Sequence, residues 1–356
     1  MKIIAVRPFI NKLALTKPYT IAYNTFADVA LVFLEITLAN GIVGLGSASP
    51  AEEVVGESPE QTLANLQTEF VENLVGRDIR HFQQIIFESH QHFALLPGTQ
   101  AAIDLALHDA FGKYLGVSVA SFYGQKVKAL PTSVTIGIMN VAETLEEAKN
   151  FAQLGFKILK VKTGIDVEED IERILRLDEL YKNKMLIRVD ANQGYSIQDL
   201  QYFLSATKEA KIELIEQPLP VGQEKGLLIL DADDRKILTA DESMKNAKYA
   251  LKFSQEPQPF GIYNIKLMKC GGIMGALSIA NIAQNAGIEL FWGCNDESIA
   301  SITAALHVAY SCPNTRYLDL DGSFDLAEDL VSGGFSIEDG LMKINDKAGF
   351  GFEILA

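Results

Sequence analysis

Charged residues stand at the ends of several strand-like runs in this chain. Lys160 and Lys162 lie one residue apart in the apolar run Leu159-Lys160-Val161-Lys162, so both side chains project to one face of a strand. A strand that is buried on both sides has no structural reason to carry two lysines on one face, which favours a chemical role. Later strand-like runs also end in charge, at Asp190, Glu216, Asp241 and Lys266.

The spacing of these charges indicates a TIM-type barrel. From Lys160 onward they follow one another at steps of about 25 to 30 residues, the length of one strand-plus-helix unit. Parallel barrel strands open on a single mouth, where active sites lie. We therefore expect three carboxylates to converge there, flanked by lysines from opposite sides. Carboxylate oxygens, with the remaining positions filled by water or substrate, suit Mg²⁺.

Each of these residues also has a plain structural explanation. An acidic residue at a strand end can cap the next helix, but three in successive strands crowd like charges that are costly without a cation. We expect Lys160 to give electrostatic support, and Lys162 and Lys266 to face each other as acid and base with pKa values lowered by nearby cations. Lys269 is expected to be a solvated loop residue.

A second acidic pair, Asp319 and Asp321, ends the eighth predicted strand. The two residues alternate, so their carboxylates face the same way. Solvated charges or helix caps are the alternative explanation. Set apart from the three-carboxylate cluster, the pair suits a receptor for a cationic group of the substrate.

Composition narrows the class of protein. A chain of 356 residues accommodates one barrel of about 250 residues and a smaller domain. The net charge of -15 argues against a nucleic-acid or anionic-membrane partner. The apolar run Met1 to Val6 is too short for a signal or membrane segment, so we expect a cytoplasmic protein. Cys270, Cys294 and Cys312 lack C-x-x-C spacing and predict neither disulfides nor structural zinc.

Periodicity along the chain predicts an α/β protein with three segments. Residues 1–125 read as an antiparallel meander followed by packed helices, with loops at 18–28 and 47–58 that could close over a site. Residues 126–321 read as the TIM-type barrel, and 322–356 as short extended pieces that return to the N-terminal domain. The eight predicted barrel strands are 133–138, 157–162, 185–190, 212–217, 237–240, 262–267, 289–293 and 315–320.

The charged strand ends lie in a set of recognisable motifs. These are Lys160-Val161-Lys162, Asp190-Ala191-Asn192-Gln193-Gly194, Glu216-Gln217-Pro218, Asp241-Glu242-Ser243 and Asn264-Ile265-Lys266-Leu267-Met268-Lys269-Cys270-Gly271-Gly272. On them, almost the whole chain resembles the enolase superfamily, in its muconate-lactonising subgroup. The resemblance implies a (β/α)₇β barrel under an α+β capping domain formed by the N-terminal region and the C-terminal tail. It also implies Mg²⁺ on Asp190, Glu216 and Asp241, and acid/base roles for Lys162 and Lys266. Phe291-Trp292-Gly293-Cys294-Asn295 lacks the histidine of the mandelate racemase subgroup.

Asp319-Leu320-Asp321 is similar to the Asp-x-Asp with which dipeptide epimerases of this subgroup hold the substrate's terminal ammonium. Where members acting on Ala-Glu place an arginine, this chain has Asn24. The resemblance therefore implies an Ala-X dipeptide with an uncharged X, while Glu52 and Glu53 keep a cationic side chain possible. The expected substrate-binding residues are Asp319, Asp321, Thr135, Asn24, Cys294 and Asp296.

The reaction that this resemblance implies is inversion of the C-terminal residue by proton transfer between two lysines, through an enediolate that Mg²⁺ and Lys160 stabilise. The alternatives with the same lysines and metal are N-acylamino acid racemase, o-succinylbenzoate synthase and muconate cycloisomerase. A non-catalytic metal-binding protein on the same barrel is the alternative from another class. We expect a small dipeptide as ligand, a homo-oligomer, and a role in peptidoglycan peptide metabolism.

Overall fold

A barrel of parallel strands forms the larger part of the protein. The structure, a computed structural model, describes residues 1–21, 24–182 and 184–355, without the side chains of residues 17–26, 53 and 54. In this part of the chain, eight strands follow one another in sequence order in one sheet. Thr132 forms a parallel bridge to Leu318 of the last strand, which nearly closes the ring. The strands are β5 (Val134–Ile136), β6 (Ile158–Lys162), β7 (Leu186–Asp190), β8 (Ile212–Glu216), β9 (Leu238–Ala240), β10 (Ile262–Ile265), β11 (Glu289–Gly293) and β12 (Thr315–Asp319).

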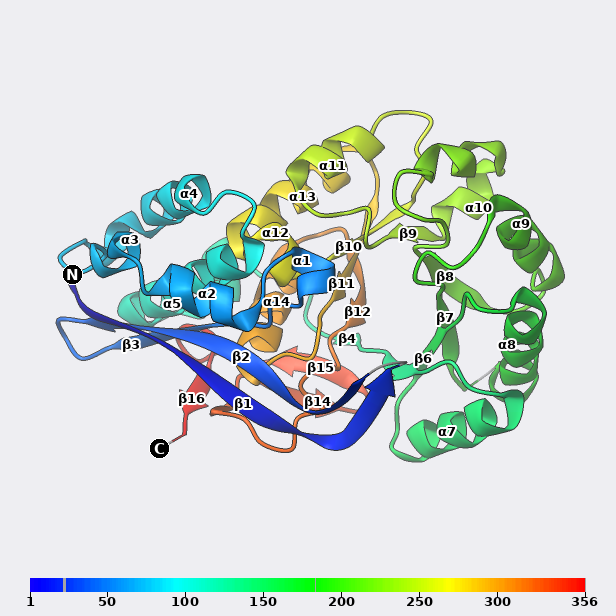
Figure 1. Cartoon of the computed structure of the whole chain (residues 1–356), viewed down its shortest axis with the longest axis horizontal. Helices are drawn as coiled ribbons and strands as arrows, with labels where there is room; N and C mark the ends of the chain where they lie inside the picture. The colour runs from blue at the N-terminus through cyan, green and yellow to red at the C-terminus, as the bar shows by residue number, and fades with distance from the viewer. Residues whose placement is uncertain (22–23, 183, 356) are drawn as a thin grey trace.

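Helices connect the barrel strands and lie outside them (Figure 1). Helix α8 illustrates why they form: Asp166 caps its first turn by accepting from the Glu168 N–H, and Ile171, Ile174 and Leu177 recur at helical spacing and are buried. The segments are α7 (Val141–Gln153), α8 (Val167–Tyr181), α9 (Ile197–Ala206), η2 (Glu224–Ile229), α10 (Ala232–Lys236), α11 (Ala247–Phe253), α12 (Leu267–Cys270), α13 (Ile273–Asn285) and α14 (Ile299–Ser311). The predicted barrel is thus confirmed, with strand ends that differ by up to two residues.

The N-terminal region is an antiparallel sheet with helices packed beside it (Figure 1). Its elements are β1 (Ile3–Ile21), β2 (Asn24–Leu38), β3 (Val43–Ala48), α1 (Glu52–Val55), α2 (Pro59–Leu66), α3 (Glu69–Glu72), η1 (Ile79–His81), α4 (Phe82–His92), α5 (Pro97–Leu115) and α6 (Val119–Tyr123). Two loop predictions are wrong here. Most of 18–28 continues β1 and β2 as a hairpin, because Ile21 pairs with Asn24, and 47–58 contains α1.

The C-terminal segment returns to the N-terminal region, as predicted. Its strands are β13 (Val331–Gly333), β14 (Phe335–Glu338), β15 (Leu341–Ile344) and β16 (Phe352–Ile354), and β15 also pairs with β4 (Leu130–Pro131). Asp109 of α5, which is buried, accepts from the Phe350 N–H at 3.1 Å. Near the barrel mouth, Leu15 of β1 forms a bridge to Leu326.

Helix α5 also joins the N-terminal region to the barrel. The carboxylate of Asp104, fully buried, accepts from the Ile273 and Met274 N–H groups at 3.0 and 3.1 Å, and so caps the first turn of α13. Gly272 precedes that turn with φ 94°, and a Cβ there would lie 2.6 Å from the Asp104 side chain. A glycine is therefore required for α5 to approach the barrel. None of the helices in the described residues is long and apolar enough to cross a membrane.

Candidate active site

The predicted charges meet at the C-terminal ends of strands β6 to β10. Lys162 pairs in register with Asp190, and Asp190 with Glu216. Asp241 follows the last residue of β9, and Lys266 follows that of β10. These strand ends border a cavity of about 1060 Å³. Residues of β1 and β2 and the segment 49–60 line its other side, so the N-terminal region covers the barrel mouth.

Lys160 is the centre of the cluster. Its Nζ lies 3.1 Å from Asp190 Oδ2, 2.8 Å from Glu216 Oε2 and 2.7 Å from Asp319 Oδ2, and its side chain is 4 % exposed. Burial opposes its charge, but the three carboxylates raise the pKa of Lys160 well above its ordinary value. It therefore remains an ammonium group and cannot act as a base near neutral pH.

The three carboxylates that contact Lys160 carry more negative charge than this one ammonium group balances. Burial, and next the charge of Asp190, raise the pKa of Glu216 to about 8. Glu216 Oε1 accepts from Asn264 Nδ2, whereas Oε2 is buried and has only its ion pair with Lys160. Among the described residues, no three His, Cys, Asp or Glu side chains are arranged around one point as a metal site. Ammonium groups contact these carboxylates, as in the Lys160–Glu216 and Lys266–Asp241 pairs. The crowded carboxylate oxygens of Asp190, Glu216 and Asp241 nevertheless are of the kind that a hard divalent cation prefers.

Lys162 and Lys266 both line the cavity and lie at the ends of strands on opposite sides of the ring. In the eight-stranded ring β6 and β10 are separated by three strands on either side, counting Thr132 to Leu318 as the closing bridge. Lys162 Nζ donates to Asp190 Oδ2 at 2.7 Å and Asn192 Oδ1 at 2.9 Å. Lys266 Nζ lies 3.0 Å from Asp241 Oδ2. The expected depression of the Lys266 pKa is not seen in the protein alone: burial lowers this pKa most, but the charges of Asp241 and Glu216 and the hydrogen bond to Asp241 together raise it above its ordinary value.

Lys269 was predicted to be a solvated loop residue, which is wrong. The short helix α12 turns it back towards the barrel, where its side chain is 3 % exposed and forms an ion pair with the Asp241 carboxylate. Its Nζ also donates to the Asp241 backbone oxygen at 2.6 Å. Burial lowers the pKa of Lys269. Lys269 therefore holds both the carboxylate and the backbone oxygen of Asp241 in place.

The acidic pair at the end of β12 is present but is not separate from the cluster. Asp319 Oδ2 contacts Lys160, while Asp319 Oδ1 accepts from the Ser133 hydroxyl at 2.6 Å. Asp321 Oδ2 accepts from the Thr135 N–H and from Thr135 Oγ1, both at 3.2 Å. Burial, and next Asp319, raise the pKa of Asp321 to about 7. The two carboxylates thus differ: Asp319 forms an ion pair with Lys160, whereas Asp321 forms no ion pair with any residue whose side chain the structure describes.

The other predicted substrate-binding residues lie around the same cavity where the structure describes them. Thr135, Cys294 and Asp296 line it. The Cys294 thiol donates to the Asp319 backbone oxygen at 3.3 Å and accepts from the Gly322 N–H at 3.3 Å, so it joins two strand ends. The side chain of Asn24 lies outside the described residues.

Two contributors to the site were not predicted from the sequence. Asn264 is fully buried and donates to Glu216, and Gly293 leaves room beside it, since a Cβ would lie 2.7 Å from Asn264 Oδ1. Asn264 and Lys266 alternate along the chain just as the first two lysines do. That period-two spacing was a usable signal for Asn264.

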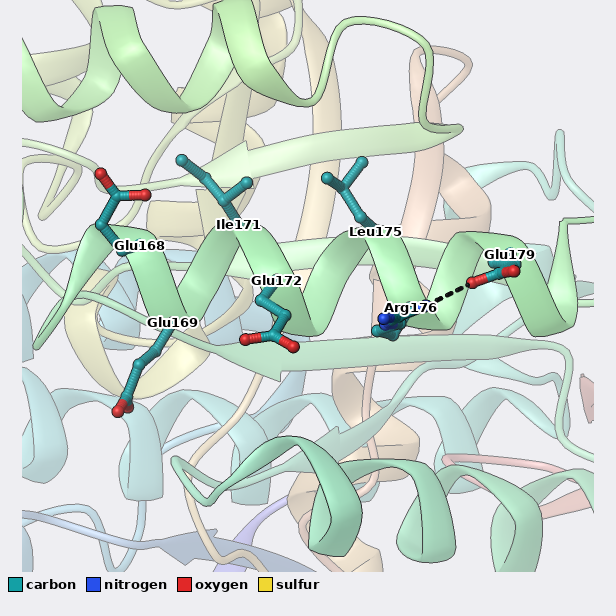
Figure 2. A pocket seen from close by; sticks show the side chains of 7 residues that line it. All are labelled: Glu168, Glu169, Ile171, Glu172, Leu175, Arg176 and Glu179. Carbon is teal, nitrogen blue, oxygen red and sulfur yellow. Dashed lines mark hydrogen bonds and ion pairs between the residues drawn. The ribbon is translucent and has the colours of Figure 1, made fainter.

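A second hollow lies on the outer face of α8 and offers no such chemistry. Figure 2 shows its side chains projecting from this helix, with Arg176 paired to Glu179 and Ile171 and Leu175 between the acidic residues. Its lining comes from one helix, and it is a solvated surface groove. The mouth of the barrel remains the candidate site.

The fold and its charged mouth define the class of protein: a TIM-type barrel with a site of lysines and carboxylates beneath a capping domain. Two family models match the chain. The mandelate racemase / muconate lactonizing enzyme N-terminal domain covers residues 3–124, and the enolase C-terminal domain-like model covers residues 143–356. The chain belongs to the enolase superfamily.

Relatives with assigned names match over nearly their whole length. An L-Lys-D/L-Arg epimerase from Desulforapulum autotrophicum is 48% identical over 351 residues, which are 99% of both chains. The dipeptide epimerase of Methylococcus capsulatus, solved with Mg and the dipeptide L-Arg-D-Lys, superposes with a TM-score of 0.95 at 44% identity, covering 99% of each chain. That of Enterococcus faecalis, solved with Mg and L-Leu-L-Tyr, gives a TM-score of 0.91 at 32% identity, covering 99% of this chain and 100% of that one. The predicted enzyme class, an isomerase, is confirmed.

Proposed function

We propose that this protein is a Mg²⁺-dependent dipeptide epimerase that inverts the C-terminal residue of dipeptides built from basic amino acids. The observation that carries the proposal is the placement of Lys162 and Lys266 on β6 and β10, on opposite sides of the ring. Epimerisation requires a base on one face of a carbon and an acid on the other. Two amines that flank one cavity supply both.

The proton balance is simple. One lysine, as the neutral amine, takes the α-proton of the second residue when the C–H bond breaks, and the other, as ammonium, returns a proton to the opposite face. Lys160, a permanent ammonium, stabilises the negative charge that develops on the substrate's carboxylate. Each positioned acid or base contributes about 10²- to 10⁴-fold to the rate.

The metal ligands would be Asp190, Glu216 and Asp241. When bound there, Mg²⁺ would add positive charge beside the substrate's carboxylate. It would also balance the negative charge of these three ligands, so that they would raise the pKa values of the lysines less. The excess of buried negative charge at Glu216 supports this assignment. The relatives solved with Mg support it independently.

The terminal ammonium of the dipeptide would bind Asp319 and Asp321, with Thr135 holding the second carboxylate by two hydrogen bonds. This arrangement favours a free amino terminus over an acylated one. Two like charges in a buried site require a cation to balance them, and a substrate ammonium provides it.

The side chains of the substrate are proposed to be basic, in place of the Ala-X dipeptide with an uncharged X. The names of the relatives from Desulforapulum autotrophicum and Methylococcus capsulatus specify Lys and Arg. The charge of the cavity agrees: of the described residues that line it outside the reaction centre, five are acidic and two, Lys12 and Lys245, are basic. The acidic residues are Asp28, Glu60, Glu242, Asp296 and Asp325.

The test is hydrogen exchange in heavy water with Mg²⁺ present. L-Lys-L-Arg and L-Arg-L-Lys should incorporate deuterium at the second α-carbon and yield the second diastereomer. L-Ala-L-Leu and L-Ala-L-Glu serve as matched uncharged and acidic substrates and should turn over at least tenfold less efficiently in kcat/KM. Absence of exchange with every free dipeptide would reject the activity, and a preference for L-Ala-L-Leu would reject the basic specificity.

A further inference from the structure

An arginine lies inside the barrel, where no charge is expected. Arg188 of β7 is 1 % exposed, two residues before Asp190 on the same inward face. Its guanidinium lies 5.3 Å from the ring centroid of Phe291 and 5.4 Å from that of Tyr317. Guanidinium groups remain charged in proteins, so burying one is costly unless its donors are used. The contacts of Arg188 therefore need an explanation beyond packing.

Those contacts connect the barrel interior to the acidic pair. Arg188 Nε donates to Glu213 Oε2 at 2.6 Å, towards the N-terminal ends of the strands. Arg188 Nη1 donates to Ser133 Oγ at 3.1 Å and to the Leu318 backbone oxygen. Ser133 Oγ in turn lies 2.6 Å from Asp319 Oδ1. One continuous chain of polar groups thus reaches from Glu213 to Asp319.

The chemistry of the groups fixes the direction of this chain. Arginine can only donate, so the Ser133 oxygen accepts from it. The single hydroxyl proton of Ser133 has two acceptors in reach, the Leu318 oxygen at 3.3 Å and Asp319 Oδ1 at 2.6 Å. The shorter contact, to a charged acceptor, is the stronger one. Since Asp319 Oδ2 is bound to Lys160, both oxygens of this carboxylate are held and its plane is fixed.

We propose that Ser133 and Arg188 are positioning residues that orient Asp319 for the amino terminus of the substrate. The inference rests on the proposed dipeptide epimerase function. Among the described residues, the side-chain hydrogen bonds of Asp321 come from Thr135 alone. Asp319 is therefore the fixed half of the ammonium receptor, and its orientation is set from the barrel interior rather than by the substrate.

Ser133→Ala tests the positioning role. It removes the hydrogen bond from Ser133 to Asp319 and leaves the Arg188–Glu213 pair intact. With L-Lys-L-Arg in the exchange assay, KM should rise about tenfold, which is about 1.4 kcal/mol, and kcat should stay within about threefold. Nα-acetyl-L-Lys-L-Arg lacks the terminal α-ammonium group and keeps only the ammonium of its lysine side chain, so its inhibition constant should be the same for the variant and the wild type. Ser311→Ala is the matched control, since it removes a buried hydroxyl that bonds only the His307 backbone oxygen.

Three results overturn the proposal while leaving the enzyme's activity established: an unchanged KM in Ser133→Ala, an equal loss of affinity for the acetylated dipeptide, or an equal effect in Ser311→Ala. A wild type without exchange rejects the underlying function instead. If Ser133→Ala does not fold, Ser133→Cys tests the same contact, because a thiol of similar size is a weaker donor; it should raise KM in the same direction, and a wild-type KM overturns the proposal.

Discussion

Lys160 Nζ lies 2.7 Å from Asp319 Oδ2, and this ion pair joins two parts of the site that the sequence had suggested were separate. Lys160 belongs to the group of charges where the substrate's carboxylate is proposed to bind, and Asp319 to the receptor for its amino terminus. The two ends of a dipeptide would therefore be bound by directly linked charges. In the proposed mode of binding, the Lys160–Asp319 ion pair would fix how far apart the two ends of the substrate bind, which would favour dipeptides over longer peptides.

Replacing either lysine that flanks the cavity should stop epimerisation. Lys162→Ala or Lys266→Ala removes the proton carrier on one face, and we expect at least a 10²-fold loss in kcat. The remaining lysine should still exchange the α-proton of one diastereomer, visible by NMR in heavy water. Lys236→Ala, an exposed lysine on α10, is the control. A variant that epimerises at the wild-type rate would remove that lysine from the mechanism.

Loss of Lys160 should affect both activity and stability. Lys160→Met leaves Asp190, Glu216 and Asp319 buried without their shared cation, and breaking a buried ion pair costs about 3 to 5 kcal/mol. Urea unfolding should show this decrease, with kcat reduced at least 10²-fold. Lys149→Met breaks only an exposed pair with Glu146 and should change the free energy of unfolding by less than about 1 kcal/mol. Equal effects of the two substitutions would contradict the role of Lys160.

Asp321 should make substrate affinity depend on pH. The pKa of its carboxyl is raised to about 7 by burial and by Asp319, with Asp325 adding to the effect and Lys160 opposing it. Only the ionised form attracts an ammonium group, so KM should fall as pH rises through 7, by about tenfold between pH 6 and 7.5. Above that range the dipeptide's own amino group loses its proton. Asp321→Asn should have a higher KM without this slope, and an unchanged slope would assign the titration to another group.

Metal binding should stabilise the fold. A ligand at 100 times its dissociation constant adds about 2.7 kcal/mol to the free energy of unfolding, so Mg²⁺ should raise the melting temperature of EDTA-treated protein and restore exchange. Asp190→Asn should lose both responses. Asp233→Asn, an exposed carboxylate on α10, should keep them. A wild-type response in Asp190→Asn would place the ion elsewhere.

Local patterns were sufficient to predict the barrel and most of its mouth. The alternation of Lys160 and Lys162, and the regular distance to Asp190, follow from strand geometry and from the length of a strand-helix unit, and both can be counted along the chain. The acidic pair was found in the same way. These features depend on neighbours in sequence, so the sequence was enough.

The features that escaped prediction depend on contacts between distant residues. Lys269 is buried because α12 turns it back onto Asp241, 28 residues earlier in the chain. Ser133 and Asp319 are 186 residues apart. Residues 18–21 and 24–28 continue β1 and β2, although the polar and aromatic composition of this stretch favours a loop. No periodicity encodes such contacts, and each was found only in the folded chain.

The capping of α13 by Asp104 has a consequence for how the protein loses its structure. A helix of the barrel has its first turn completed by a carboxylate from the N-terminal region, and the tail of the chain is bound by Asp109 one turn further along α5. Neither region would keep its native hydrogen bonds if the other came apart. Calorimetry should therefore record one melting transition for both, and a fragment that begins at residue 126 should not form a barrel by itself.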